Sequence, residues 1–161
     1  MSAGVYILLG TNLGDRMANL TQAKQHISSL IGAIITQSSI YKTSAWGNTD
    51  QPDFYNQIIE VDISLKPEDA LNIILGIEHT MGRVRDKKWG PRIIDIDILL
   101  WKNQILKTAI LTIPHPGLPE RKFTLLPLAE LAPDLIHPAL LKSISQLLQE
   151  CADPLPVEKI N

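Results

Sequence analysis

Apolar and polar residues along the chain follow two different periods, which together predict strands and helices. A short apolar run over 5–9 ends at Gly10-Thr-Asn-Leu-Gly14 and predicts a strand followed by a turn. Apolar residues then recur at helical spacing after Asp15, and Gly32 is placed to end that helix. The first third of the chain therefore predicts a strand, a turn and an amphipathic helix.

The middle of the chain predicts three further strands and a second helix. β-branched segments over 34–42 and 54–64 flank a long polar loop. Pro67 lies in the first turn of a helix that runs to Gly82, and acidic residues lie near its positive end. The stretch 92–101 is apolar and β-branched enough to be a strand that is buried on at least one face.

The order of these elements is the ferredoxin-like βαββαβ pattern. We expect an α+β fold with a four-stranded antiparallel sheet, helices on one face, and an added C-terminal hairpin and helices. The fourth strand should turn back into 104–107, and short helices are expected over 126–131 and 140–151. The tail 153–161 carries no recognisable motif and is expected to pack or fray. No linker or repeat interrupts the sequence, so residues 1–161 predict a single catalytic domain.

Composition narrows the possible partners and the cellular location. The chain has 161 residues, 45% of them apolar, which suits one hydrophobic core. A net charge of -2 gives no electrostatic footprint for nucleic acid. The single cysteine, Cys151, excludes an internal disulfide and favours a reducing compartment. Without a long apolar run or a signal-peptide start, we expect a cytoplasmic monomer that binds small molecules and no membrane.

The segment 83–97 is the strongest candidate for chemistry, because five basic and three acidic residues crowd into it. Side chains of a strand alternate, so Asp95 and Asp97 share a face, with their Cα atoms about 6 to 7 Å apart. Two adjacent carboxylates need compensating positive charge. Either arginines pair with them and merely close a loop, or a divalent metal binds. The spare cations favour a metal site beside a polyphosphate.

The same residues resemble a known family. Arg83-Val-Arg85 and Trp89-Gly-Pro-Arg-Ile-Ile-Asp-Ile-Asp97 resemble the signature of 6-hydroxymethyl-7,8-dihydropterin pyrophosphokinases, which reads W-G-P-R-x-[IL]-D-[IL]-D. Further motifs follow in the family's order, and the resemblance covers roughly residues 4–137. These motifs are Gly10-Thr-Asn-Leu-Gly14, Asp50-Gln-Pro-Asp-Phe-Tyr-Asn56, Ile113-Pro-His-Pro116, Arg121-Lys-Phe123 and Leu126-Pro-Leu128.

The resemblance implies transfer of the pyrophosphoryl group of ATP to the hydroxymethyl group of the dihydropterin, with release of AMP, in folate biosynthesis. Two Mg²⁺ ions are expected on Asp95 and Asp97, where they would bridge phosphate oxygens. The implied catalytic residues are Arg83, Arg92, Asp95 and Asp97. The implied ATP contacts are Glu78, Arg83, Arg85, Trp89, Arg92, Ile98, Thr112, His115 and Arg121. The implied pterin contacts are Thr43, Ser44, Trp46, Phe54, Asn56, Asp95 and Phe123.

The pterin assignment also has a chemical basis, since a planar bicyclic ring needs aromatic faces and an amide. The chain has two phenylalanines, Phe54 and Phe123, and both fall at these positions. Plain core packing is the alternative for both of them.

Some positions depart from the family pattern. Ser44 and Ala45 stand where some members carry prolines, and Trp46 replaces a smaller apolar residue. Leu75 and Ile110 occupy positions that are polar or basic in certain relatives, and the spacing from Arg85 to Trp89 is one residue shorter than in some of them.

Two other functions fit parts of the sequence. Asp-x-Asp on a ferredoxin-like sheet would also serve a two-metal nucleotidyl-transfer domain, but the small, slightly acidic chain lacks a basic groove for a template. The other possible function is that of a regulatory module, which binds a small ligand without turnover. The carboxylate and arginine cluster exceeds what binding alone requires.

Overall fold

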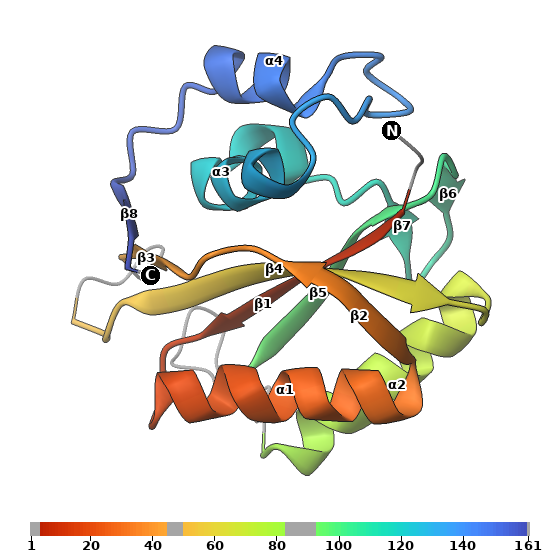
Figure 1. Ribbon diagram of the computed structural model, residues 1–161, viewed down its shortest axis with the longest axis vertical. Coiled ribbons are helices and arrows are strands. Elements are labelled where there is room, and N and C mark those ends of the chain that lie inside the picture. The colour runs from red at the N-terminus through yellow and green to blue at the C-terminus, as the bar shows by residue number, and fades with distance from the viewer. Residues whose placement is uncertain (1–3, 45–49, 83–92, 161) are drawn as a thin grey trace.

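The computed structural model of the chain describes residues 4–44, 50–82 and 93–160, and a twisted antiparallel sheet lies at its centre (Figure 1). The strands of this sheet are β1 (Val5–Thr11), β2 (Gly32–Gln37), β3 (Tyr41–Thr43), β4 (Phe54–Ile63), β5 (Asp95–Trp101) and β8 (Val157–Lys159). Their order is β5-β1-β4-β3-β8, and β2 also pairs with β4. A separate ladder joins β6 (Leu106–Lys107) to β7 (Thr112–Ile113).

Helices cover both faces of the sheet. The helices are α1 (Arg16–Leu30), α2 (Pro67–Thr80), α3 (Lys122–Leu131) and α4 (Ile144–Glu150), with a 3₁₀ turn η1 at Leu118–Glu120. Figure 1 shows α1 and α2 under one face and α3 and α4 over the other. A core cluster lies between the sheet and the helices on each face. Ile7 and Ile27 belong to the cluster between the sheet and helices α1 and α2, and Leu8 and Leu128 belong to the cluster between the sheet and α3. The predicted α+β fold is therefore confirmed, and added helices cover the second face.

Local sequence explains where the two long helices begin. The Asp15 side chain accepts a hydrogen bond from the backbone N–H of Ala18 at 3.0 Å and caps α1. Pro67 is the first residue of α2, and Glu68 and Asp69 follow it in the first turn, as predicted. None of the helices in the described ranges is long and apolar enough to cross a bilayer.

One prediction about the first half of the sheet is confirmed and another is wrong. Helix α1 ends at Leu30 with Ile31 as its C-cap, directly before Gly32, as predicted; Gly32 then opens β2, where a Cβ atom would collide with the backbone oxygen of Asp62. The stretch 34–42 is not one strand but parts of β2 and β3. The break lies at Ser38, whose hydroxyl accepts the backbone N–H of Ile58 at 2.9 Å and so takes the place of a ladder carbonyl.

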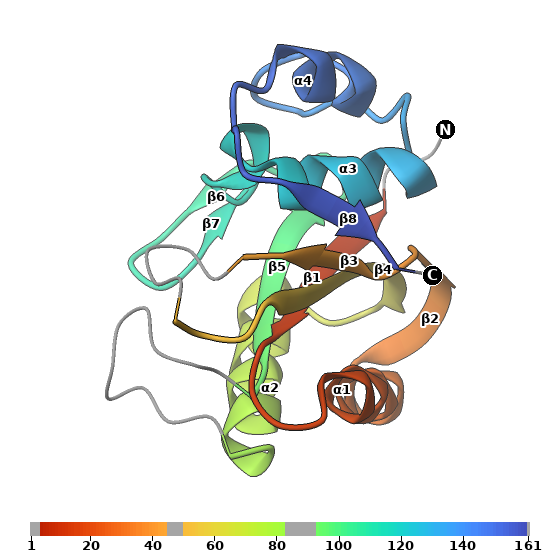
Figure 2. The same cartoon turned by 90° about the vertical axis from the view of Figure 1, so that its left-hand side faces the viewer.

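The C-terminal third also differs from its prediction. The segment 104–107 does not return along β5, because β6 pairs with β7 instead. Helix α3 begins four residues earlier than expected and contains Pro127, whereas α4 is shorter than the predicted 140–151. The tail 153–161 was expected to pack or fray, yet β8 pairs with β3 along the edge of the sheet (Figure 2).

Candidate functional site

A row of paired residues crosses the sheet and forms the floor of the candidate site. Gly10 in β1 pairs with Asp95 on one side and with Asn56 on the other, and Asn56 pairs with Tyr41. Side chains directly opposite each other share a face, so Asp95 and Asn56 stand on the same side of the sheet as α3. Because adjacent strands are about 4.8 Å apart, their Cα atoms lie about 10 Å apart. Asp95 and Asn56 therefore flank Gly10 on one face of the sheet.

Other side chains lean over position 10, where the chain has a glycine. A Cβ atom there would lie 3.3 Å from Oδ1 of Asn56 and 3.7 Å from Cδ1 of Phe54. Glycine at this position therefore lets the Asn56 oxygen and the Phe54 ring lie close to the backbone of β1.

Asn56 is oriented by hydrogen bonds that use the nitrogen of its amide. This side chain, only 3% exposed, donates from Nδ2 to Oγ1 of Thr43 at 3.1 Å and to the backbone oxygen of Tyr41 at 3.4 Å. Its Oδ1 faces Gly10 and is placed to accept a hydrogen bond from a ring N–H. The structure thus brings together four predicted pterin contacts: Thr43, Phe54, Asn56 and Asp95. Ser44 follows Thr43 and is exposed.

The two aspartates of β5 share one face, as predicted. Ile94, Ile96 and Ile98 are at most 5% exposed and belong to the core under α1 and α2, whereas Asp95 and Asp97 are partly exposed. Two carboxylates on one face suit Mg²⁺, which prefers oxygen ligands and often takes only one or two from protein. The described residues contain no group of three or more candidate metal ligands, so phosphate oxygens and water would complete the coordination of an ion at this position.

Glu78 and Ile98 lie on the core side of this strand. Glu78 is 4% exposed, and its Oε2 accepts the backbone N–H of Ile96 at 2.9 Å, which ties α2 to the edge strand β5. The Ile98 side chain is also buried, so a nucleotide would reach this residue only through its backbone. Their nucleotide-binding roles stay predictions.

His115 joins a second set of predicted residues to β5. Its backbone N–H donates to the oxygen of Leu99 at 2.9 Å, and its Nδ1 accepts the backbone N–H of Gly117 at 3.0 Å. Burial and the nearby Arg121 guanidinium lower the pKa of His115, so the ring is neutral at pH 7 and its Nε2–H is a donor. Thr112, in β7, lies three residues before it.

Arg121 lies directly over a glycine. A Cβ atom on Gly117 would lie 2.8 Å from Cζ of Arg121, and that guanidinium carbon is 5.9 Å from the centre of the Phe123 ring. Arg121 is exposed, whereas Phe123 is half-buried against the core under α3. His115, Arg121 and Phe123 therefore lie close together at the beginning of α3, and their binding roles stay predictions.

Several predicted site residues cannot be placed in this geometry. Arg83, Arg85, Trp89, Arg92 and Trp46 lie outside the described residues, and their roles stay predictions. Leu75 and Ile110, which depart from the family pattern, are 41% and 64% exposed.

Sequence reasoning missed the buried polar residues that hold the site together. Asn12 is fully buried, and its Nδ2 donates to Oε1 of Gln51 at 3.0 Å and to the oxygen of Pro52 at 3.2 Å, just before β4. Arg16 donates to the backbone oxygen of Asp53 at 2.7 Å. The sequence did contain one signal for the role of Asn12, because this short polar residue comes directly after a buried strand.

Tyr41 and Glu130 form a second such contact, between β3 and α3. The Tyr41 hydroxyl donates to Oε1 of Glu130 at 2.6 Å, and Ser39 donates to Oε2 through both its backbone N–H and its hydroxyl. Burial and this carboxylate raise the pKa of Tyr41. No sequence pattern indicated this pair, because its members are 89 residues apart.

Comparisons with known proteins agree with this geometry. The model of the family described as 7,8-dihydro-6-hydroxymethylpterin-pyrophosphokinase (HPPK) matches residues 6–133. The chain is 42% identical over 132 residues to the 2-amino-4-hydroxy-6-hydroxymethyldihydropteridine pyrophosphokinase of Methylorubrum extorquens, covering 81% of this chain and 84% of that one. It is 38% identical over 148 residues to the Aquifex aeolicus protein of the same name, covering 92% of each.

Solved structures show the same fold. A crystal structure of Plasmodium falciparum HPPK-DHPS superposes with a TM-score of 0.73 at 17% identity. The match covers 93% of this chain but 45% of that one, so the chain spans less than half of that protein. Since the family model matches most of the sequence and the relatives align over most of their length, this chain belongs to the 7,8-dihydro-6-hydroxymethylpterin-pyrophosphokinase family.

Proposed function

We propose that this chain transfers the pyrophosphoryl group of ATP to the hydroxymethyl group of 6-hydroxymethyl-7,8-dihydropterin, giving AMP and the pterin diphosphate in folate biosynthesis. Family membership supports the reaction. The single structural observation that carries it is the row across the sheet in which Gly10 pairs with Asp95 of β5 on one side and with Asn56, whose amide oxygen faces Gly10, on the other.

The pterin would lie beside this row, on the face of the sheet that carries Asp95 and Asn56. Oδ1 of Asn56 accepts a ring N–H, and Phe54 and Phe123 offer their faces to the flat ring. With the ring anchored at Asn56, the hydroxymethyl group points toward Asp95 and Asp97. Binding in this orientation places the reacting hydroxyl where the phosphates arrive, which removes most of the entropic cost of the encounter.

The phosphates would lie between β5 and the beginning of α3. Neutral His115 donates from Nε2 and Arg121 donates from its guanidinium to phosphate oxygens. The pterin oxygen forms a bond to the β-phosphorus, the bond from that phosphorus to the oxygen bridging it to the α-phosphate breaks, and the hydroxyl proton passes to solvent. AMP leaves with the electron pair of the broken bond.

Asp95 and Asp97 are the residues that would hold Mg²⁺, and two ions are proposed. Bound Mg²⁺ would neutralise charge on the phosphate oxygens and lower the pKa of the attacking hydroxyl. The partly exposed position of both carboxylates on one face supports this assignment. A monomeric state and a cytoplasmic location stay predictions.

The test is a product analysis. The purified chain is incubated with ATP, Mg²⁺ and 6-hydroxymethyl-7,8-dihydropterin, and the nucleotides are separated, with controls that lack pterin or contain a chelator. AMP that forms only when pterin and Mg²⁺ are both present supports the proposal. ADP would mean transfer of a single phosphoryl group, and pyrophosphate released without pterin would favour nucleotidyl transfer.

A further inference from the structure

The C-terminal segment 153–160 contacts the candidate site at two separate places, and the first is the beginning of α3. Oδ2 of Asp153 accepts the backbone N–H of Lys122 at 3.2 Å, and its Oδ1 accepts that of Leu155 at 3.0 Å. The first N–H groups of a helix have no partner within the helix, and Arg121, the residue before α3, forms no capping side-chain bond in the described structure. Asp153 therefore supplies an acceptor to the residue that directly precedes Phe123.

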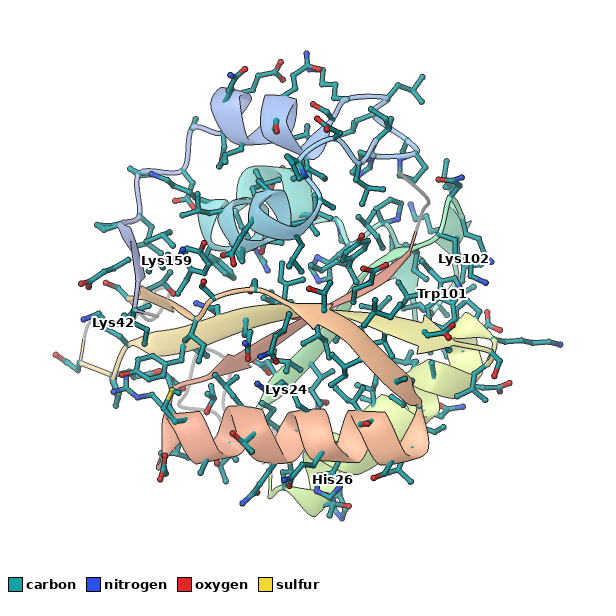
Figure 3. All side chains as sticks on the ribbon, in the orientation of Figure 1. Lys24, His26, Lys42, Trp101, Lys102 and Lys159 are labelled. Carbon is teal, nitrogen blue, oxygen red and sulfur yellow. The ribbon has the colours of Figure 1, made fainter. Side chains whose placement is uncertain are left out.

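The second contact is the pairing of β8 with β3. Val157 pairs with Thr43, and the backbone N–H of Ile160 donates to the oxygen of Ile40 at 2.9 Å. Figure 2 shows β8 lying along β3, and Figure 3 labels Lys42 and Lys159 on these two strands. Without β8, the three-residue strand β3 would be an unprotected edge, and short edge strands separate easily.

These two anchors lie next to the two aromatic rings proposed to enclose the pterin. Thr43, held by β8, pairs with Phe54. Lys122, held by Asp153, directly precedes Phe123. The connector between the anchors is Pro154-Leu-Pro156, and two prolines in three residues make it stiff and extended.

We propose that the segment 153–160 is a positioning strap that fixes the distance between Phe54 and Phe123 and thereby sets the affinity for the pterin. The proposal rests on the proposed function. The strap touches neither substrate; it acts through the register of β3, which supplies both acceptors of the Asn56 amide, and through the first turn of α3. A tail that only adds stability would lower the melting temperature and leave the dissociation constant for the pterin unchanged.

Each anchor is tested by its own variant. Asp153→Ala removes the acceptor at α3, and a chain that ends at Pro156 removes β8 but keeps Asp153. The matched control is Glu150→Gln in α4, which breaks an exposed ion pair with Lys142 (2.7 Å) outside the strap. The dissociation constant for the pterin is measured by fluorescence titration, together with KM for both substrates and the melting temperature.

We expect the dissociation constant and KM for the pterin to rise about five- to tenfold in Asp153→Ala, the effect of about one lost hydrogen bond, and by at least as much in the shortened chain, which loses the whole pairing of β8 with β3. Asp153→Asn should recover part of the loss, because its single amide oxygen can still accept from Lys122 or from Leu155 but not from both. In the shortened chain, KM for ATP should stay within about twofold of the original value, since β8 contacts only the pterin side. The control should resemble the unchanged chain.

Pterin affinity within about twofold of the original in both strap variants would overturn the proposal, as would a lower melting temperature without loss of affinity. If the shortened chain does not fold, Ile160→Pro removes the N–H that donates to Ile40 together with the Ile160 side chain that packs against the core, and it is measured in the same way with Ile160→Ala as the control for the lost side chain. An unchanged chain that makes no AMP overturns the proposed function and the strap with it. An active chain with unaffected strap variants overturns the strap alone.

Discussion

The role of Thr43 in orienting the Asn56 amide can be tested by replacing one group, the Thr43 hydroxyl. Thr43→Val replaces the hydroxyl with a methyl group of nearly the same size, so packing at this 4% exposed position is preserved. The change removes the acceptor that lies 3.1 Å from Nδ2 of Asn56. The remaining acceptor, the backbone oxygen of Tyr41, is 3.4 Å away and forms a long, weak bond. One N–H of a buried amide is then left without a good partner.

The expected size of the effect follows from this geometry. Leaving a buried donor unsatisfied costs about 1 to 3 kcal/mol, and about 1.4 kcal/mol corresponds to a tenfold change in an equilibrium constant. We expect the Asn56 amide to rotate away from Gly10 to relieve this loss. Its oxygen then no longer faces the pterin, so the same free-energy cost appears as weaker pterin binding. We expect KM for the pterin to rise about tenfold, with KM for ATP unchanged, and the melting temperature to fall by about 2 to 6 °C.

The assay follows AMP formation while the pterin concentration is varied, and scanning calorimetry gives the melting temperature. Thr43→Ser is the matched control, because it keeps the hydroxyl and loses only the methyl group. If Thr43→Val keeps the original KM for the pterin, Thr43 does not hold the amide and Oδ1 of Asn56 is not the fixed acceptor for the pterin ring. Equal losses in the valine and serine variants would point to packing instead of the hydrogen bond.

Three further changes test other parts of the site. Arg121→Ala removes the exposed guanidinium; KM for ATP should rise about tenfold in steady-state kinetics, and an unchanged value would exclude Arg121 as a phosphate contact. Asp97→Asn should leave the circular dichroism spectrum intact and lower turnover by about a hundredfold or more, whereas near-normal turnover with Mg²⁺ would contradict the metal assignment. Burial lowers the pKa of His137 from its ordinary 6.5. The unfolded chain therefore gains a proton at a higher pH than the folded chain. The contribution of neutral His137 to the free energy of unfolding is fully present above pH 6.5 and is lost as the pH falls toward the folded pKa. Urea unfolding between about pH 7.5 and about pH 5.5 should show this loss, and His137→Asn should reduce it unless other groups cause it.

Elements with a strong local pattern were predictable from sequence. The alternation in β5 placed Asp95 and Asp97 on one face because a buried strand fixes which side each residue occupies. Asp15 and Pro67 marked the beginnings of their helices because capping depends on only a few neighbouring residues.

Features that depend on distant residues were not predictable in this way. The sequence around Ser38 is as β-branched as a continuous strand, and the interruption arises from its bond to Ile58 in another strand. The close contact between Gly117 and the Arg121 guanidinium depends on where Arg121 lies, and the role of β8 depends on an open edge at β3. Each of these is decided by tertiary contacts that no local pattern encodes.

The outer edge of β5 has a consequence for the behaviour of the protein at high concentration. An edge strand with unpaired backbone groups is a template on which another molecule can add a strand. In β5 the backbone N–H of Ile96 is bonded to Glu78 and the oxygen of Leu99 to the N–H of His115, so two of the groups that such an addition would use are already occupied. The contacts that tie β5 to α2 and to His115 thus leave fewer free backbone groups on this edge for another molecule to pair with, and we expect a weaker Glu78 contact to lower the solubility of the protein.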